Sequence, residues 1–185
     1  MSTSHQSPVT GHGAEAPSAW VVRWADRVPA GGRVLDVACG IGRHARYFAA
    51  RGYPVDAVDR DATALAGLAG VRGVTARDAD IEGGPWPYEG QRFAGIIVTN
   101  YLHRPLFAHL LAGLAPGGVL ICETFAAGNE RYGRPSNPAF LLKPGELLEV
   151  VRGRLRVVAY EDLYVTDPKP AMIQRLCAIH SGAGS

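Results

Sequence analysis

The chain has 185 residues, 47% of them hydrophobic, which is enough apolar material for one domain with its own core. Its 19 basic and 17 acidic residues leave a formal charge of +2, which excludes the strong basic field typical of nucleic-acid-binding proteins. Residues 1–17 are rich in Ser, Gly, Pro and His, so we expect them to be disordered and a single domain to span residues 18–185.

From Ala19 onward, short apolar runs alternate with amphipathic segments, as in a parallel sheet wrapped by helices. In chain order the pattern predicts a helix over 19–28, a strand over 33–37, a helix over 43–51, a strand over 54–58, a helix over 61–69 and strands over 74–77 and 94–99. A helix from Pro105, a strand over 119–123, a helix over 144–151 and strands over 155–160 and 173–179 follow. The strands up to residue 123 count as five βα units.

The last two predicted strands are close enough in sequence to pair antiparallel at one edge of the sheet. The sequence therefore predicts an α/β domain with a doubly wound, mostly parallel seven-stranded sheet and a C-terminal antiparallel hairpin. The helix over 19–28 is expected either to cover a ligand pocket as a lid or simply to pack its apolar face on the sheet.

Two glycines follow the first predicted strand. The string VLDVACGIG at 34–42 places Gly40 and Gly42 between a buried strand and a helix, where a ligand can lie against bare backbone near helix N–H donors. The residues from Gly40 to Ala45 also fit the dinucleotide pattern G-x-G-x-x-A, and Asp59 ends the second strand, where a ribose-binding carboxylate belongs. The glycines alone leave S-adenosylmethionine, NAD or a tight turn without a ligand as alternatives.

Longer strings resemble the class I S-adenosylmethionine-dependent methyltransferases. DVACGIGRHARYFAARGYPVDAVD at 36–59 closely resembles the first two motifs of that superfamily, and it is most similar to the branch that contains tellurite-resistance methyltransferases. LAPGGVLICETF at 114–125 resembles a later motif. The resemblance covers residues 33–125 well and is weak beyond them. It implies a Rossmann-like enzyme whose cofactor is S-adenosylmethionine.

The resemblance also implies roles for residues near the glycine loop. Gly40 and Gly42 would pack against the methionine part of the cofactor, and Asp36 would help to hold its amino group. Asp59 would bind the ribose hydroxyls. Asp61 lies near the same strand end and has an alternative role there, either as a helix cap or as a loop residue.

Further along the chain, the resemblance implies contacts with the adenine. Asp80 would bind the adenine by a hydrogen bond and Ile81 by apolar contact. Asp78 lies close to the end of the same strand, where its role could instead be that of a helix cap or a loop residue. Asn100 and Tyr101 would line the pocket at the end of the fourth strand.

Candidates for catalysis follow the fourth and fifth predicted strands. Methyl transfer from a sulfonium is an in-line displacement, so the enzyme chiefly positions the acceptor and removes a proton where necessary. His103 is the candidate general base or acceptor-orienting group, with capping of the helix at Pro105 as the equal alternative. His44 is expected to be an exposed first-turn residue rather than a catalytic one. Glu123 has two open roles, binding an acceptor amine or bonding loop backbone.

The stretch AAGNERYGRPSNPAFLL at 126–142 leaves the fifth strand and lacks periodicity, so we expect it to set acceptor specificity. Its Arg131, Tyr132, Arg134 and Asn137 are suited to an anionic or polar small molecule. The alternative is a structural loop that uses these groups for its own hydrogen bonds.

Nucleic-acid substrates are disfavoured by two local features. Related enzymes that methylate amino groups on DNA or glutamine carry Asn-Pro-Pro-Tyr after the fourth strand, whereas Asn100 is followed here by Tyr-Leu-His. Arg152, Arg154 and Arg156 alternate along the expected edge strand, where solvated charges that block edge pairing are commoner than a phosphate track.

The sequence shows no sign of export, membrane insertion or metal binding. The amino terminus lacks the basic start and apolar stretch of a signal peptide, and no later run approaches the length of a membrane span. The three cysteines lie far apart, as free thiols do in a reducing cytosol, and the six histidines lack metal-ligand spacing. We therefore expect a cytoplasmic protein without a metal site.

These patterns together favour S-adenosylmethionine-dependent methyl transfer to a small-molecule acceptor, either a chalcogen oxyanion or a polar metabolite. The alternatives are an NAD-dependent oxidoreductase on the same fold and a non-catalytic S-adenosylmethionine-binding protein. Neither the acceptor nor the oligomeric state follows from the sequence, because the fold alone does not determine the reaction.

Overall fold

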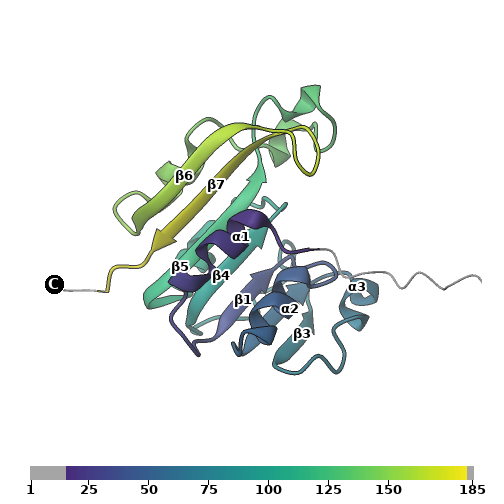
Figure 1. The fold of residues 1–185 in the computed structure, drawn as a ribbon, viewed down its shortest axis with the longest axis vertical. Helices are drawn as coiled ribbons and strands as arrows, with labels where there is room; N and C mark the ends of the chain where they lie inside the picture. The colour runs from purple at the N-terminus through teal and green to yellow at the C-terminus, as the bar shows by residue number, and fades with distance from the viewer. Residues whose placement is uncertain (1–15, 183–185) are drawn as a thin grey trace, which may run out of the picture.

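The computed structural model of the protein describes residues 16–182, which form a seven-stranded sheet in the order β3-β2-β1-β4-β5-β7-β6 (Figure 1). The strands are β1 (Val34–Val37), β2 (Val55–Asp59), β3 (Val74–Asp78), β4 (Phe93–Thr99), β5 (Leu114–Phe125), β6 (Arg156–Val165) and β7 (Ala171–Ile179). Strands β1 to β5 are parallel, and β7 runs antiparallel to both β5 and β6. The expected doubly wound sheet with a C-terminal antiparallel hairpin is confirmed.

The α-helices are α1 (Ala19–Trp24), α2 (Arg43–Ala50), α3 (Ala62–Ala66), α4 (Leu106–Ala112) and α5 (Glu146–Val151). Single 3-10 turns follow at Ala25–Arg27, Asn129–Arg131 and Pro138–Phe140. The expectation of five βα units is wrong, because the connection from β3 to β4 over 79–92 consists of turns without a helix. Its Gly-Gly-Pro-Trp-Pro run interrupts helical hydrogen bonding.

Two hydrophobic cores cover the two faces of the sheet. Helices α1, α2 and α3 pack on one face, visible as the near face in Figure 1, and Phe48 and Ile97 belong to the core on that face. Helices α4 and α5 pack on the other face, and Leu110 and Ile96 belong to its core. Because neighbouring residues of a strand point to opposite faces, Ile96 and Ile97 belong to different cores. This double burial explains why the strands read as continuous apolar runs rather than alternating ones.

The C-terminal hairpin is longer than the pattern predicted. Strand β6 extends to Val165 because its outer edge is solvent-facing and tolerates the polar run that hid it in the sequence. The predicted alternation of three arginines along this strand is wrong. Only Arg156 lies in β6, whereas Arg152 ends α5 and Arg154 lies in the turn around Gly153, whose φ is +68°.

The loop after β5 is held at both ends. Ala126 and Leu142 form an isolated parallel bridge, so the chain between them leaves the sheet and returns to nearly the same place. Of the segment expected to be disordered, residues 1–15 lie outside the described residues, while Ala16 and Pro17 are described. Within residues 16–182, none of the helices has the length and apolar character needed to cross a bilayer.

Candidate active site

The carboxyl ends of the parallel strands meet at the point where the strand order reverses, between β1 and β4, and a cavity of about 230 Å³ opens there. Its walls come from the residues that follow β1, β2, β3 and β4. The lining residues are Ala38, Asp59, Arg60, Asp80, Ile81, Glu82, Asn100 and Tyr101. The structure thus brings together five of the residues predicted to bind the cofactor, namely Asp59, Asp80, Ile81, Asn100 and Tyr101.

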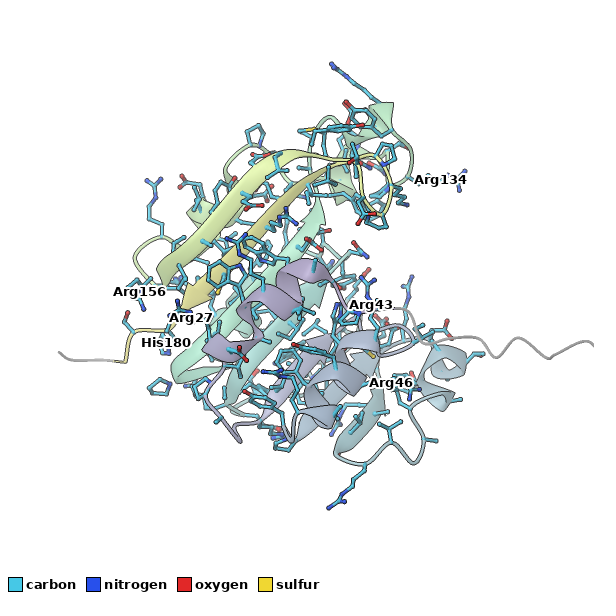
Figure 2. All side chains as sticks on the ribbon, viewed as in Figure 1. Arg27, Arg43, Arg46, Arg134, Arg156 and His180 are labelled. Atoms are coloured by element: carbon cyan, nitrogen blue, oxygen red, sulfur yellow. The ribbon has the colours of Figure 1, made fainter. Side chains whose placement is uncertain are left out.

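A larger cavity of about 1110 Å³ adjoins the first, because Asn100 lines both. Its walls are the segment 16–19, the ends of β5 and β7, part of the loop 126–142, and the turn between β6 and β7. Figure 2 shows Arg43 and Arg134 at this end of the molecule, whereas Arg27, Arg156 and His180 lie at the opposite end.

Asp59 fixes the glycine loop above the smaller cavity. One carboxylate oxygen accepts the N–H of Gly40 at 2.8 Å, and the other accepts the N–H of Asp61 at 2.9 Å. Gly40 has a φ of +53°, and a methyl group placed on its Cα would meet no atom within 4 Å. The backbone at Gly40 therefore faces open space, as a loop that receives a ligand requires. Asp61 itself caps α3.

Gly42 has a different reason to be glycine. Its φ is +76°, and a Cβ at this position would lie 2.5 Å from Cδ2 of Leu68 in the segment after α3. This overlap would force the core against α2 to move. The absence of a side chain at Gly42 therefore permits Leu68 to pack closely against the glycine loop.

Asp36 lies beneath the glycine loop and lines neither cavity. It is buried, and its carboxylate accepts the backbone N–H of Ala45 at 2.9 Å in the first turns of α2. Burial raises the pKa of Asp36 to about 7, against the lowering effect of the Ala45 hydrogen bond. The carboxyl group shown here joins β1 to α2.

Three hydrogen bonds hold the rim of the smaller cavity. One oxygen of Asp80 accepts the backbone N–H groups of Glu82 and Gly83, both at 3.0 Å, and these bonds lower the pKa of Asp80. The Tyr101 hydroxyl donates to Oε1 of Glu82 at 3.0 Å. The Asp80 bonds shape the turn after β3, the Tyr101 bond joins that turn to the segment after β4, and Ile81 is part of the cavity lining.

The two candidate histidines differ in how they lie. His103 is half-buried and lines neither cavity, although it follows β4 as expected. The expectation that His44 is exposed is wrong, since it is only 2% exposed. Its Nε2 accepts the Ser18 N–H at 3.1 Å, and its Nδ1 lies 3.5 Å from the Thr99 hydroxyl. Burial, followed by the charge of Arg43, lowers the pKa of His44 to about 3, so this imidazole is neutral.

Glu123, at the wall of the larger cavity, binds protein groups on both sides. Its Oε1 accepts the Ser18 hydroxyl at 2.7 Å, and its Oε2 accepts an Arg175 N–H at 3.2 Å. Arg175 also donates to Glu161 at 2.6 Å. The sequence reasoning missed Ser18 and Arg175. Ser18 carried a usable signal, a serine directly before an amphipathic helix, whereas Arg175 carried none, because its role depends on the pairing of β7 with β5.

The loop 126–142 contributes only some of its predicted acceptor-binding residues to the larger cavity. Arg134 and Asn137 line it, together with Phe140. Arg131 and Tyr132 do not, and the ring of Tyr132 packs 4.9 Å from that of Tyr164 on β6. Periodicity could not separate these residues because the loop has none.

The sequence pattern of the methyltransferase-domain family matches residues 10–150. TehB from Haemophilus influenzae has a similar structure, with a TM-score of 0.72 at 18% identity over 87% of this chain. The match covers 61% of TehB, so this chain spans less than two thirds of its length.

Two further solved structures share the fold. An S-adenosylmethionine-dependent methyltransferase from Mesorhizobium loti has a TM-score of 0.68 at 19% identity, covering 88% of this chain and 98% of its own. The glycopeptide N-methyltransferase MtfA in complex with S-adenosyl-L-homocysteine has a TM-score of 0.61 at 19% identity, covering 86% of this chain and 88% of its own. Among curated proteins, none matches the sequence. The chain therefore belongs to the methyltransferase-domain family and has the fold of class I S-adenosylmethionine-dependent methyltransferases.

Proposed function

We propose that the protein transfers a methyl group from S-adenosylmethionine to a small-molecule acceptor. The observation that carries the proposal is the convergence of Asp59, Asp80 and the open backbone of Gly40 at the edge where ligands bind in open α/β sheets. The adjoining larger cavity offers room for a second molecule, and Asn100 lines both spaces.

The residues of the smaller cavity suit the adenosine part of the cofactor. Each oxygen of Asp59 accepts one backbone N–H and keeps acceptor capacity for a ribose hydroxyl. Ile81 offers an apolar surface and Asp80 an acceptor for the adenine. Asp36 would act through its contact with Ala45, by holding the loop and the start of α2 in place.

The bound cofactor supplies a methyl group that is electrophilic because it is attached to a sulfonium. A lone pair of the acceptor would take up the methyl group, the electrons of the carbon–sulfur bond would stay on sulfur, and any acceptor proton would pass to water. The protein's contribution would be to hold the acceptor in line with the methyl group. The acceptor would lie in the larger cavity, as a chalcogen oxyanion or a polar metabolite.

Titration calorimetry with S-adenosylmethionine, S-adenosylhomocysteine, NAD and NADH tests this proposal. We expect the first two to bind and Asp59→Asn to weaken them by roughly a hundredfold, since it removes a charge-assisted acceptor from the cavity. Asp61→Asn is the matched control, because asparagine also caps helices and Asp61 does not line the cavity. Binding of the nicotinamide dinucleotides alone would overturn the proposal.

A further inference from the structure

We infer that the acceptor of the larger cavity is an organic anion with an apolar body, and that a bare inorganic oxyanion is not its main ligand. The inference rests on the proposed function and narrows it. Three properties of the cavity wall carry it: the arrangement of its charges, the nature of its apolar surface, and its size.

Positive charge reaches the cavity from several segments, among them the start of α2, where Arg43 lies in the wall. Arg134 comes from the loop after β5 and Lys169 from the turn between β6 and β7. Within residues 16–182, neither forms a salt bridge with a carboxylate. By contrast, Arg175 in the same wall is bound to Glu123 and Glu161, so its charge is already matched inside the protein. Two cations that line one cavity and have no carboxylate partner among the described residues favour an anionic ligand.

Asp167 also lines this cavity, and its carboxylate would repel an anion bound close to it. It lies in the same turn as Lys169, so the formal charges of these two residues cancel, and the excess positive charge comes from other segments of the wall, with Arg134 and Arg43. We therefore place the anionic group of the ligand closer to Arg134 than to the turn, with Lys169 as its second partner.

Apolar side chains form the rest of the wall. Phe140 is 54% exposed at the cavity, and Phe125 lies at the end of β5 beneath the Lys169 ammonium, which is 5.8 Å from its ring centre. Pro135 and Ile173 continue this surface. A large aromatic ring left in contact with water next to unpaired cations is typical of a site for an amphipathic ligand. An inorganic oxyanion has no apolar body to cover these rings.

The size of the cavity leads to the same ligand class. Its volume of about 1110 Å³ slightly exceeds the range of roughly 300 to 1,000 Å³ found for sites of drug-sized ligands. A cavity of this volume has room for the methionine end of the cofactor at the Asn100 side and for a ligand larger than an ion with three or four oxygens.

Fluorescence titration with 8-anilinonaphthalene-1-sulfonate tests the inference in the presence of saturating S-adenosylhomocysteine. The matched neutral probe is N-phenyl-1-naphthylamine, which has the same ring system without the sulfonate. We expect the sulfonate to bind with one-to-one stoichiometry and more tightly than the neutral probe. Naphthalene-1-sulfonate should displace it, and sodium selenite at the same concentration should not.

Variants of Arg134 and Lys169 show whether these two cations bind the sulfonate group of the probe. Arg134→Gln and Lys169→Gln should each weaken the sulfonate probe by about tenfold and leave the neutral probe unchanged, as expected for the loss of one charge-assisted contact. Phe140→Ala should weaken both probes. Arg154→Gln, on an exposed turn away from the cavity, is the control for a general change in charge and should alter neither.

The inference is overturned if the two probes bind equally, if the sulfonate does not bind, if Arg134→Gln and Lys169→Gln bind it as well as the parent protein does, or if selenite displaces it as effectively as naphthalene-1-sulfonate. Repeating the titration without S-adenosylhomocysteine shows whether the anion site exists independently of cofactor binding, so a failure of the inference can be distinguished from a failure of the proposed function. Selective sulfonate binding by a protein that does not bind S-adenosylmethionine would sink the proposed function and leave the anion site standing.

Discussion

The hydroxyl of Ser18 donates a hydrogen bond to Oε1 of Glu123 at 2.7 Å, across 105 positions of the sequence. The hydroxyl oxygen of Ser18 accepts the Trp20 and Val21 N–H groups and thereby caps α1, while the Ser18 backbone N–H donates to His44 on α2. One serine therefore joins the segment before α1, the end of β5 and the start of α2. Because residues 16–19 form a wall of the larger cavity, these bonds also shape that cavity.

Replacing Ser18 with alanine should lower the stability of the protein. The substitution removes the cap of α1, which contributes about 1 kcal/mol, and leaves Glu123 with one partner fewer. In a domain of this size a loss of 1 kcal/mol lowers the melting temperature by roughly 2 to 4 °C. Circular dichroism melts check this expectation. Ser18→Thr keeps a hydroxyl and should recover most of the loss, whereas an alanine variant that melts like the parent would show that the serine bonds add nothing.

Asp36 predicts a pH dependence of stability. Its pKa is raised from an ordinary value of 3.8 to about 7 in the folded protein, so the folded state keeps a proton that the unfolded state has lost. The stabilising effect of that proton is complete below pH 3.8 and is lost as the pH rises toward 7. Asp36→Asn cannot ionise, so its stability relative to the parent should increase over this window by roughly 1 kcal/mol per pH unit.

Urea unfolding of both proteins at several pH values measures this difference. His44 titrates in the opposite sense, since its lowered pKa removes stability as the pH falls from 6.5 toward 3, but it is present in both proteins and cancels. A constant offset, from the extra amide hydrogens of asparagine, also leaves the slope unchanged. Parallel stability curves for the two proteins would mean that Asp36 is not protonated in the folded state.

The two loop glycines should respond differently to alanine. Both have positive φ, so each substitution costs roughly 1 to 2 kcal/mol of backbone strain. At Gly42 the new methyl group also overlaps Leu68, which adds roughly 1 to 3 kcal/mol. Gly42→Ala should therefore melt at a clearly lower temperature than Gly40→Ala in the absence of ligand. Equal melting temperatures would contradict the packing role of Gly42.

The hydrophobic pattern was sufficient for most of the fold. Apolar runs bounded by glycine and proline located every strand, because strands buried on both faces are composed mainly of apolar residues. The pattern failed at the outer part of β6, where a polar run forms a strand. Residues 161–165 lie at the edge of the sheet, partly exposed to solvent. The turns over 79–92 were missed as well, since Ile81 and Tyr88 enter the core without belonging to any periodic element.

By itself, the sequence determined the features that depend on neighbours along the chain: the glycine turn after β1, the cap of α3 by Asp61, and the carboxylates at the strand ends. These features follow from steric and hydrogen-bonding rules that act over a few residues. Tertiary structure alone decided which polar groups remain available to a ligand. Arg175 is matched by Glu123 and Glu161, and His44 is buried under Ser18, while Arg134 stays at the cavity wall. Each of these outcomes depends on a partner far away in sequence, and only the packing of the sheet brings such partners together.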